Sequence, residues 1–312
     1  MMEKNIFTAL KECVDGRETQ IRVSEREWLT PSYIVTLAAY AKQHSVPRES
    51  FIFESQNHQG YLNTIGFDSL WGTPCAVERP NAGKKYSVLT LLDNEESTDF
   101  ANTQITSCIS AFTNDDKSEG VAFLKEVIGE VHDNVWSHGK STGFSMAQIY
   151  SNGFIEFALA DCGGGFLKEL NRVGLNNIQS HEGAIEWCIQ KGNSSKKIED
   201  QRDSDWLQQL PSDTIGNPMG SIAKYKKSNN HAGLGLAKLI ELIQQYEGIL
   251  CIASGKAILS ISDSKRSIDI RSTTHNWNGV IIMCKLNEKK LKSKASNDAD
   301  SEISSILDAL TD

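Results

Sequence analysis

The most regular hydrophobic pattern of the chain starts at Val121 and predicts an amphipathic helix. Its apolar stripe repeats every three to four residues through Leu124, Val127, Ile128, Val131 and Val135. A polar row at four-residue spacing runs beside the stripe and consists of Glu130, Asn134 and His138. At about 100° per residue this row lies roughly 80° from the stripe, which puts it at the rim of the core. The solvated face is predicted to carry Lys125, Glu126, His132 and Asp133.

Shorter patterns predict small elements on both sides of this helix. Strands are expected at 20–23, 51–53, 86–92, 154–160, 248–252 and 280–283. A helix is expected to begin at Thr30-Pro31-Ser32, because a hydroxyl and a proline suit a helix start. Another is expected over 100–112, and one follows Gly233. The predicted elements are short helices and strands that alternate along the chain.

The segment 73–85 is rich in proline, glycine and charge, and predicts a boundary. We therefore expect a small α/β domain at 1–90, a larger domain at 91–287 and a charged tail at 288–312. The tail is basic over 289–294 and acidic over 297–312, with apolar residues at helical spacing in the acidic part. It is either a solvated tail or a helix that docks on a partner or on the chain itself.

Composition narrows the class of protein. The 312 residues include 32 Lys and Arg against 40 Asp and Glu, so the net charge is −8. The electrostatic field of this negative net charge disfavours binding to nucleic acid or to an anionic membrane. The seven cysteines are scattered without metal-type spacing, which favours reduced thiols. No signal-peptide-like or membrane-spanning apolar run occurs, so we expect a cytoplasmic protein.

Two glycine motifs carry the candidate chemistry. The predicted strand 154–160 runs into Asp161-Cys162-Gly163-Gly164-Gly165, and Gly233-Leu234-Gly235-Leu236 opens a predicted helix. Glycine lets backbone approach a ligand closely, and a helix N-terminus presents free N–H groups to phosphate. Neither motif is a Walker A loop or a GxGxxG dinucleotide fingerprint.

The order of three motifs is more specific than any one of them. Glu130-x-x-x-Asn134, Asp161-x-Gly163-x-Gly165 and Gly233-x-Gly235 resemble the three boxes of the GHKL ATPase superfamily, over roughly residues 100–286. The resemblance implies an α+β fold of the Bergerat type, a mixed and mainly antiparallel sheet with helices on one face. It also implies ATP and Mg²⁺ as cofactors.

The resemblance assigns roles at the base end of the nucleotide. Asp161 matches the aspartate that accepts a hydrogen bond from the adenine amino group. Gly163 and Gly165 match the glycines that let base and ribose approach the backbone. One position departs from the pattern, because Val280 stands where many members carry a threonine that supports adenine through water.

The resemblance also assigns roles at the phosphate end. Asn134 matches the Mg²⁺ ligand, Glu130 matches the base that activates water, and His138 matches a variable position. The second glycine box, which wraps the phosphates, matches Gly233, Leu234, Gly235 and Leu236. The segment 166–232 matches the ATP lid, in which a phosphate-contacting element matches Ser194, Ser195 and Lys196. A basic cluster before the second box consists of Lys224, Lys226, Lys227 and His231.

Three functions follow from the resemblance. The first is hydrolysis of Mg²⁺-ATP in a cytoplasmic regulatory role, and the alternatives are a nucleotide-sensing module without significant hydrolysis or an anti-sigma-type serine kinase. The first hundred residues bear a weaker resemblance to a STAS-like domain, with Ser32 as a helix cap or a phosphorylatable hydroxyl. Expected partners are ATP or ADP, and a protein bound by the N-terminal domain or the tail. A homodimer stays open.

Overall fold

The structure is a computed structural model that describes residues 6, 9, 11, 20–73, 78–114, 117–139, 141–195, 198, 234–262 and 265–293, with backbone alone at 136–139 and 265. None of the helices in these ranges is both long enough and apolar enough to cross a membrane. The fold is of the α+β class, as predicted, with one large sheet and one small one.

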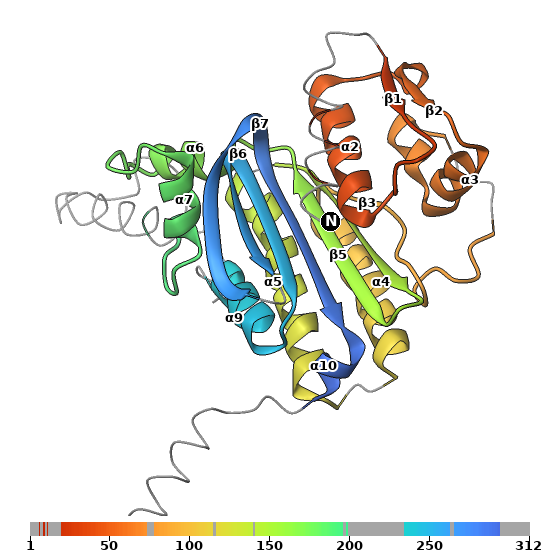
Figure 1. Cartoon of the computed structure of the whole chain (residues 1–312). Coiled ribbons are helices and arrows are strands. Elements are labelled where there is room, and N and C mark those ends of the chain that lie inside the picture. Colours follow the sequence, from red (N-terminus) through yellow and green to blue (C-terminus); the bar gives the residue numbers. More distant parts are fainter. Residues whose placement is uncertain are drawn as a thin grey trace, which may run out of the picture.

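The large sheet has five strands in the order β3-β4-β5-β7-β6, and every neighbouring pair is antiparallel (Figure 1). The strands are β3 (Thr90–Leu92), β4 (Gly143–Tyr150), β5 (Phe154–Asp161), β6 (Ile249–Ser262) and β7 (Lys265–Asn287). The predicted strand at 86–92 is shorter than expected, and those at 248–252 and 280–283 are parts of much longer ones. The patterns gave no sign of β4, which forms a hairpin with β5.

One face of this sheet is covered by the predicted amphipathic helix and its neighbours. They are α4 (Glu95–Thr113), α5 (Glu119–Gly139), α9 (Gly235–Gln245) and the short α10 (Glu288–Lys292). The whole predicted stripe of α5 is buried in the core between helices and sheet. Two more helices, α6 (Gly165–Arg172) and α7 (His181–Cys188), pack against β6 and β7.

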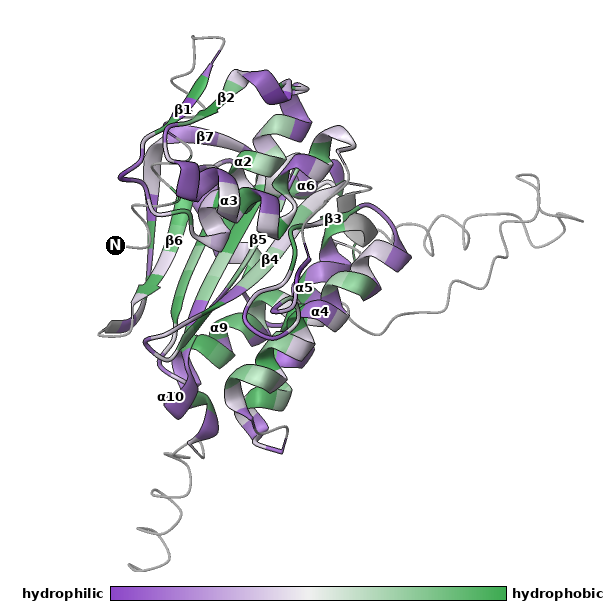
Figure 2. Ribbon diagram, turned by 90° about the vertical axis from the view of Figure 1, so that its right-hand side faces the viewer, coloured by the Kyte–Doolittle hydropathy of each residue, from purple (hydrophilic) through white to green (hydrophobic). Residues whose placement is uncertain are grey.

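The opposite face is covered by α2 (Pro31–His44), which lies across β4 and β5 (Figure 1). The sheet therefore has helices on both faces, because the N-terminal segment, which lies outside the domain expected to have helices on one face, supplies the second layer. The strands β4, β5 and β6 are largely green in Figure 2, as expected when both faces of a sheet are buried. Whether residues 1–90 fold as a separate domain stays a prediction, but they share a core with the sheet.

The remaining N-terminal elements lie around α2. The strands β1 (Ile21–Val23) and β2 (Phe51–Phe53) pair in parallel, as the sequence pattern predicts two strands here. The short η1 (Arg48–Ser50), α3 (Gln56–Ile65) and η2 (Phe67–Trp71) complete the segment. Its aromatic side chains pack together, with the Phe67 ring edge-on to the rings of both Phe51 and Phe53.

A buried carboxylate ties α2 to the sheet. Glu156 on β5 is 2% exposed, and its Oε1 accepts hydrogen bonds from the Ser32 hydroxyl at 2.9 Å and the Ser32 N–H at 3.2 Å. Its Oε2 accepts one from the Tyr150 hydroxyl at 3.0 Å. Burial raises the pKa of Glu156, and the hydrogen bonds from Ser32 oppose that shift. The N-cap of α2 is Thr30, so the interpretation of Ser32 as the cap is wrong; its hydroxyl holds the helix to β5 instead.

His132 does not lie on a solvated face of α5, contrary to the prediction. It is fully buried, because α4 packs over that side of the helix. Its Nδ1 donates to Asn102 Oδ1 at 2.6 Å, and its Nε2 accepts from the Ser145 hydroxyl at 2.7 Å. Burial lowers the pKa of His132 to about 3, so the imidazole stays neutral in the folded protein.

This burial predicts an acid-sensitive stability. The unfolded chain takes up a proton at His132 below pH 6.5, and the folded chain does so only near pH 3, so stability is lost as pH falls through that window. At ~1.4 kcal/mol per pH unit, the stability advantage of wild type over His132→Gln shrinks by about 2 kcal/mol between pH 7.5 and 5. Urea denaturation at several pH values measures this. Parallel pH curves for the two proteins would contradict the burial of a neutral imidazole.

Candidate functional site

A cavity of about 670 Å³ lies between α5, α6, α7 and the start of α9, with β5 and β7 beneath it. Residues from separate sequence motifs meet there. Eight of the predicted site residues line the cavity: Asn134, Asp161, Gly163, Gly165, Ser194, Ser195, Gly235 and Leu236. Leu234 and Glu130 do not line it. Lys196, Gly233, the basic cluster before the second glycine box and the side chain of His138 lie outside the described residues.

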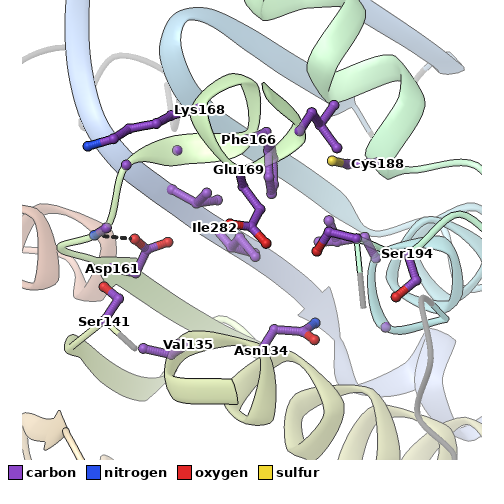
Figure 3. Close-up of a pocket in the computed structure, with 18 of the residues that line it drawn as sticks. Asn134, Val135, Ser141, Asp161, Phe166, Lys168, Glu169, Cys188, Ser194 and Ile282 are labelled. Carbon is purple, nitrogen blue, oxygen red and sulfur yellow. Dashed lines mark hydrogen bonds between the residues drawn. The ribbon is translucent and has the colours of Figure 1, made fainter. Parts of the chain in front are cut away.

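Asp161 occupies one end of the cavity, at the last position of β5 (Figure 3). One of its carboxylate oxygens accepts a hydrogen bond from the Gly163 N–H at 2.6 Å. Removal from water raises the pKa of Asp161 to about 7, although the backbone N–H groups of Gly163 and Val280 partly stabilise the charge. Val280, the departure from the family pattern, lines the cavity beside it.

Two glycines with positive φ allow the chain to close around Asp161. Gly279 has φ 130°, and a Cβ there would lie 2.2 Å from the Asp161 carbonyl oxygen. Gly165 has φ 78°, and a Cβ there would lie 2.8 Å from Ser254 Oγ and 3.0 Å from the Gly279 carbonyl oxygen. The chain's own packing therefore requires these glycines. The sequence interpretation missed a role for Gly279, and its only sequence signal is a glycine just before a strand-like run.

The other end of the cavity carries small polar groups. Asn134 extends from α5 toward the cavity, and Ser194 lies on the far side from Asp161 (Figure 3). Ser194 is 6% exposed, and its Oγ has no hydrogen-bond partner among the described residues. Gly235 lets α9 approach α5, because a Cβ there would lie 3.1 Å from the Asn134 amide nitrogen. The N-terminus of α9 therefore opens beside Asn134 and Ser194.

Glu130 lies one turn before Asn134 on α5, packed against Gly235, and is 6% exposed. Its carboxylate is paired with the ammonium group of Lys238 from α9, which also contacts Glu126 Oε1 at 2.6 Å. Hydrogen bonds to Glu126 and Glu130 raise the pKa of Lys238. Lys238 was not predicted, because no local pattern shows that α9 brings a lysine to the polar row of α5.

The walls combine apolar surface with charges from α6. Apolar side chains line the cavity from two strands and three helices: Val131, Leu159, Phe166, Leu170, Trp187 and Ile282. Sequence reasoning missed Glu169 and Arg172 of α6, which also line it and form an ion pair at 2.8 Å. Such an arrangement, mostly apolar with a few placed polar groups, suits a small organic ligand.

The predicted metal role of Asn134 has no cluster of protein ligands behind it. Among the described residues, no group of three or more His, Cys, Asp and Glu side chains is arranged to hold a metal ion. An amide carbonyl with phosphate and water as the other ligands is a usual way to hold Mg²⁺. The Asn134 role therefore fits Mg²⁺ that arrives with a polyphosphate, and it stays a prediction.

No protein-family model matches the chain, and a search of curated proteins found no match either.

The raised pKa of Asp161 predicts that its buried charge destabilises the fold at neutral and higher pH. Its pKa is about 7 in the fold against 3.8 ordinarily, so the stability it contributes is present at low pH and is lost as pH rises to about 7. Asp161→Asn keeps an acceptor oxygen and removes the charge. The unfolding free energy of this variant minus that of wild type should rise by about 3 kcal/mol between pH 5 and pH 8, at ~1.4 kcal/mol per pKa unit.

Urea denaturation of ligand-free protein at both pH values measures the gain. Asp99→Asn is the control, because Asp99 is exposed on α4 and its removal leaves the cavity intact. If Asp161→Asn lost the same stability at both pH values, the charge of Asp161 would not be the destabilising feature.

Proposed function

We propose that the protein binds Mg²⁺-ATP in this cavity and hydrolyses its γ-phosphate. One observation carries the proposal. A desolvated carboxylate acceptor stands at one end of a largely apolar cavity. At the other end stand a helix N-terminus, an amide and a hydroxyl that has no hydrogen-bond partner among the described residues. A nucleotide has the matching order of groups, a flat base with an amine donor at one end and a charged polyphosphate at the other.

The base end supports adenine over guanine. The Asp161 carboxylate accepts hydrogen bonds, and adenine presents an exocyclic amine where guanine presents a carbonyl oxygen. A carbonyl facing a buried carboxylate leaves both groups without a donor, which is costly away from water. The apolar side chains of Leu159 and Ile282 provide surface for the ring.

The phosphate end supports a polyanion. The 11-residue helix α9 begins at Gly235, which lines that part of the cavity, and the helix dipole favours negative charge at this end. Ser194 Oγ is a donor that still has no partner among the described residues. Mg²⁺, when bound, would neutralise phosphate charge, and Asn134 is the residue that would hold it. Local donors of this kind can act against the overall charge of −8.

Hydrolysis requires Glu130 to orient or deprotonate a water molecule. The ammonium group of Lys238 occupies one oxygen of its carboxylate, and Glu130 does not line the cavity. The hydrolase hypothesis therefore requires that the ammonium of Lys238 move off Glu130 when phosphate occupies the site. The same ion pair favours a second candidate, a nucleotide-sensing module in which Glu130 stays paired and the γ-phosphate is retained.

Nucleotide binding is tested by calorimetric titration with ATP and GTP at pH 8, above the pKa of Asp161. Wild type should prefer ATP by about 100-fold or more, because guanine leaves the buried acceptor unpaired. Asp161→Asn should lose at least about tenfold in ATP affinity, since its amide adds a donor facing the adenine amine. Asp99→Asn should bind like wild type. Unchanged ATP affinity in Asp161→Asn contradicts the placement of the base.

Hydrolysis is tested by phosphate release at saturating Mg²⁺-ATP. Glu130→Gln should keep ATP affinity within about threefold and lose 10²- to 10⁴-fold in rate, roughly the contribution of a general base. Lys238→Met should release phosphate several-fold faster than wild type, because no ammonium group then occupies the Glu130 carboxylate. Lys256→Met, at an exposed position of β6, is the matched control.

Melting temperatures establish that the variants are folded, since Lys238→Met leaves a buried carboxylate without its counter-charge. ATP binding without phosphate release by either wild type or Lys238→Met would reject the hydrolase and leave the sensing module.

A further inference from the structure

Glu169 brings a negative charge into the middle of the cavity. Its side chain descends from α6, and its carboxylate lies between Asp161 at one end and Ser194 at the other (Figure 3). The side chain is 22% exposed. The sequence motifs give this residue no role, and the proposed roles of Asp161, Asn134 and Glu130 do not use it.

The carboxylate is held in a defined orientation. Arg172, one turn further along α6, donates from Nε to Glu169 Oε2 at 2.8 Å and from Nη2 to Oε1 at 2.9 Å. This two-point contact fixes the plane of the carboxylate. Each oxygen can accept a further hydrogen bond, because a carboxylate offers about four acceptor positions and Arg172 uses two.

The ion pair with Arg172 does not cancel the effect of the Glu169 charge on other groups that line the cavity. Cys188 of α7 lines the same cavity, and burial together with the charge of Glu169 raises the pKa of its thiol to about 12. A phosphate group placed at this point would meet a like charge. A neutral group with hydroxyl donors would find two oriented acceptors.

The part of a nucleotide that lies between its base and its phosphates is the sugar. We propose that Glu169 binds a ribose hydroxyl and selects ribonucleotides over deoxyribonucleotides; this inference rests on the proposed binding of ATP in the cavity. A carboxylate is a strong acceptor for a sugar hydroxyl, and the same chemistry reads the ribose in dinucleotide-binding folds. Glu169 is therefore a specificity-determining residue, and Arg172 positions it.

The test compares the dissociation constants of ATP, 2′-deoxy-ATP and 3′-deoxy-ATP by calorimetric titration. Wild type should bind ATP about tenfold more tightly than at least one of the deoxy compounds, as expected for one hydrogen bond to a charged acceptor. Glu169→Ala should lose that preference, because ATP weakens about tenfold and the affected deoxy compound changes by less than about threefold. Glu169→Gln keeps an acceptor and should fall between them. Glu186→Ala, at an exposed position of α7, is the control and should keep the wild-type ratio.

The outcomes separate the two proposals. If wild type binds none of the three nucleotides, the proposed function fails. If wild type binds ATP but shows no preference over either deoxy compound, or if Glu169→Ala keeps the preference, the assignment of Glu169 is overturned while nucleotide binding stands. Equal weakening of all three ligands in Glu169→Ala likewise overturns it, since the residue would then only support the fold of α6.

Discussion

Asp161 keeps its carboxylate away from bulk water at the end of β5, and three stretches of the chain are shaped around it. The turn after β5 supplies the Gly163 N–H, β7 comes within van der Waals range because residue 279 is glycine, and Gly165 packs on that same glycine. An acid buried with so few partners costs stability at neutral pH. A hydrogen-bond donor of a bound ligand would satisfy this carboxylate and offset the cost. The proposed function therefore places the ligand's donor at Asp161.

The helix α5 connects this end of the cavity to the other. Its apolar stripe packs into the core, so its polar row is forced to the boundary between core and cavity. Asn134 reaches the cavity, whereas Glu130, one turn earlier, is covered by Lys238. The two residues share one row, yet the arrival of α9 gives them different surroundings. Under the proposed function, the strength of the contact between that ammonium group and Glu130 decides between hydrolysis and nucleotide sensing.

The strand β5 contributes residues both to the cavity and to the contact with α2. Its last residue is Asp161, and Glu156 on the same strand holds the start of α2 through Ser32. The N-terminal segment is therefore attached to the sheet by buried hydrogen bonds as well as by apolar packing. A buried acceptor satisfied by three donors is sensitive to the loss of any of them, so this contact specifies where α2 lies.

The sequence by itself determined the elements and motifs that depend on local spacing. The stripe of α5, the start of α2 near Thr30 and the residues of two glycine motifs were all readable, because helical and strand periodicity and glycine backbone freedom are local properties. The α+β class was implied by the family resemblance. The sequence also indicated that Asn134, Asp161, Ser194 and Gly235 belong together, through the order of motifs.

Only the tertiary structure decided which surfaces are covered and which charges meet. His132 has the spacing of an exposed residue, and α4 buries it; Glu130 has the spacing of a rim residue, and α9 brings Lys238 to it. Glu169 and Arg172 look like an ordinary helical ion pair until α6 is seen above the cavity. Periodicity assigns a residue to a face of its own element, but the environment of that face is set by elements distant in the chain, and that environment determines burial, pKa and chemistry.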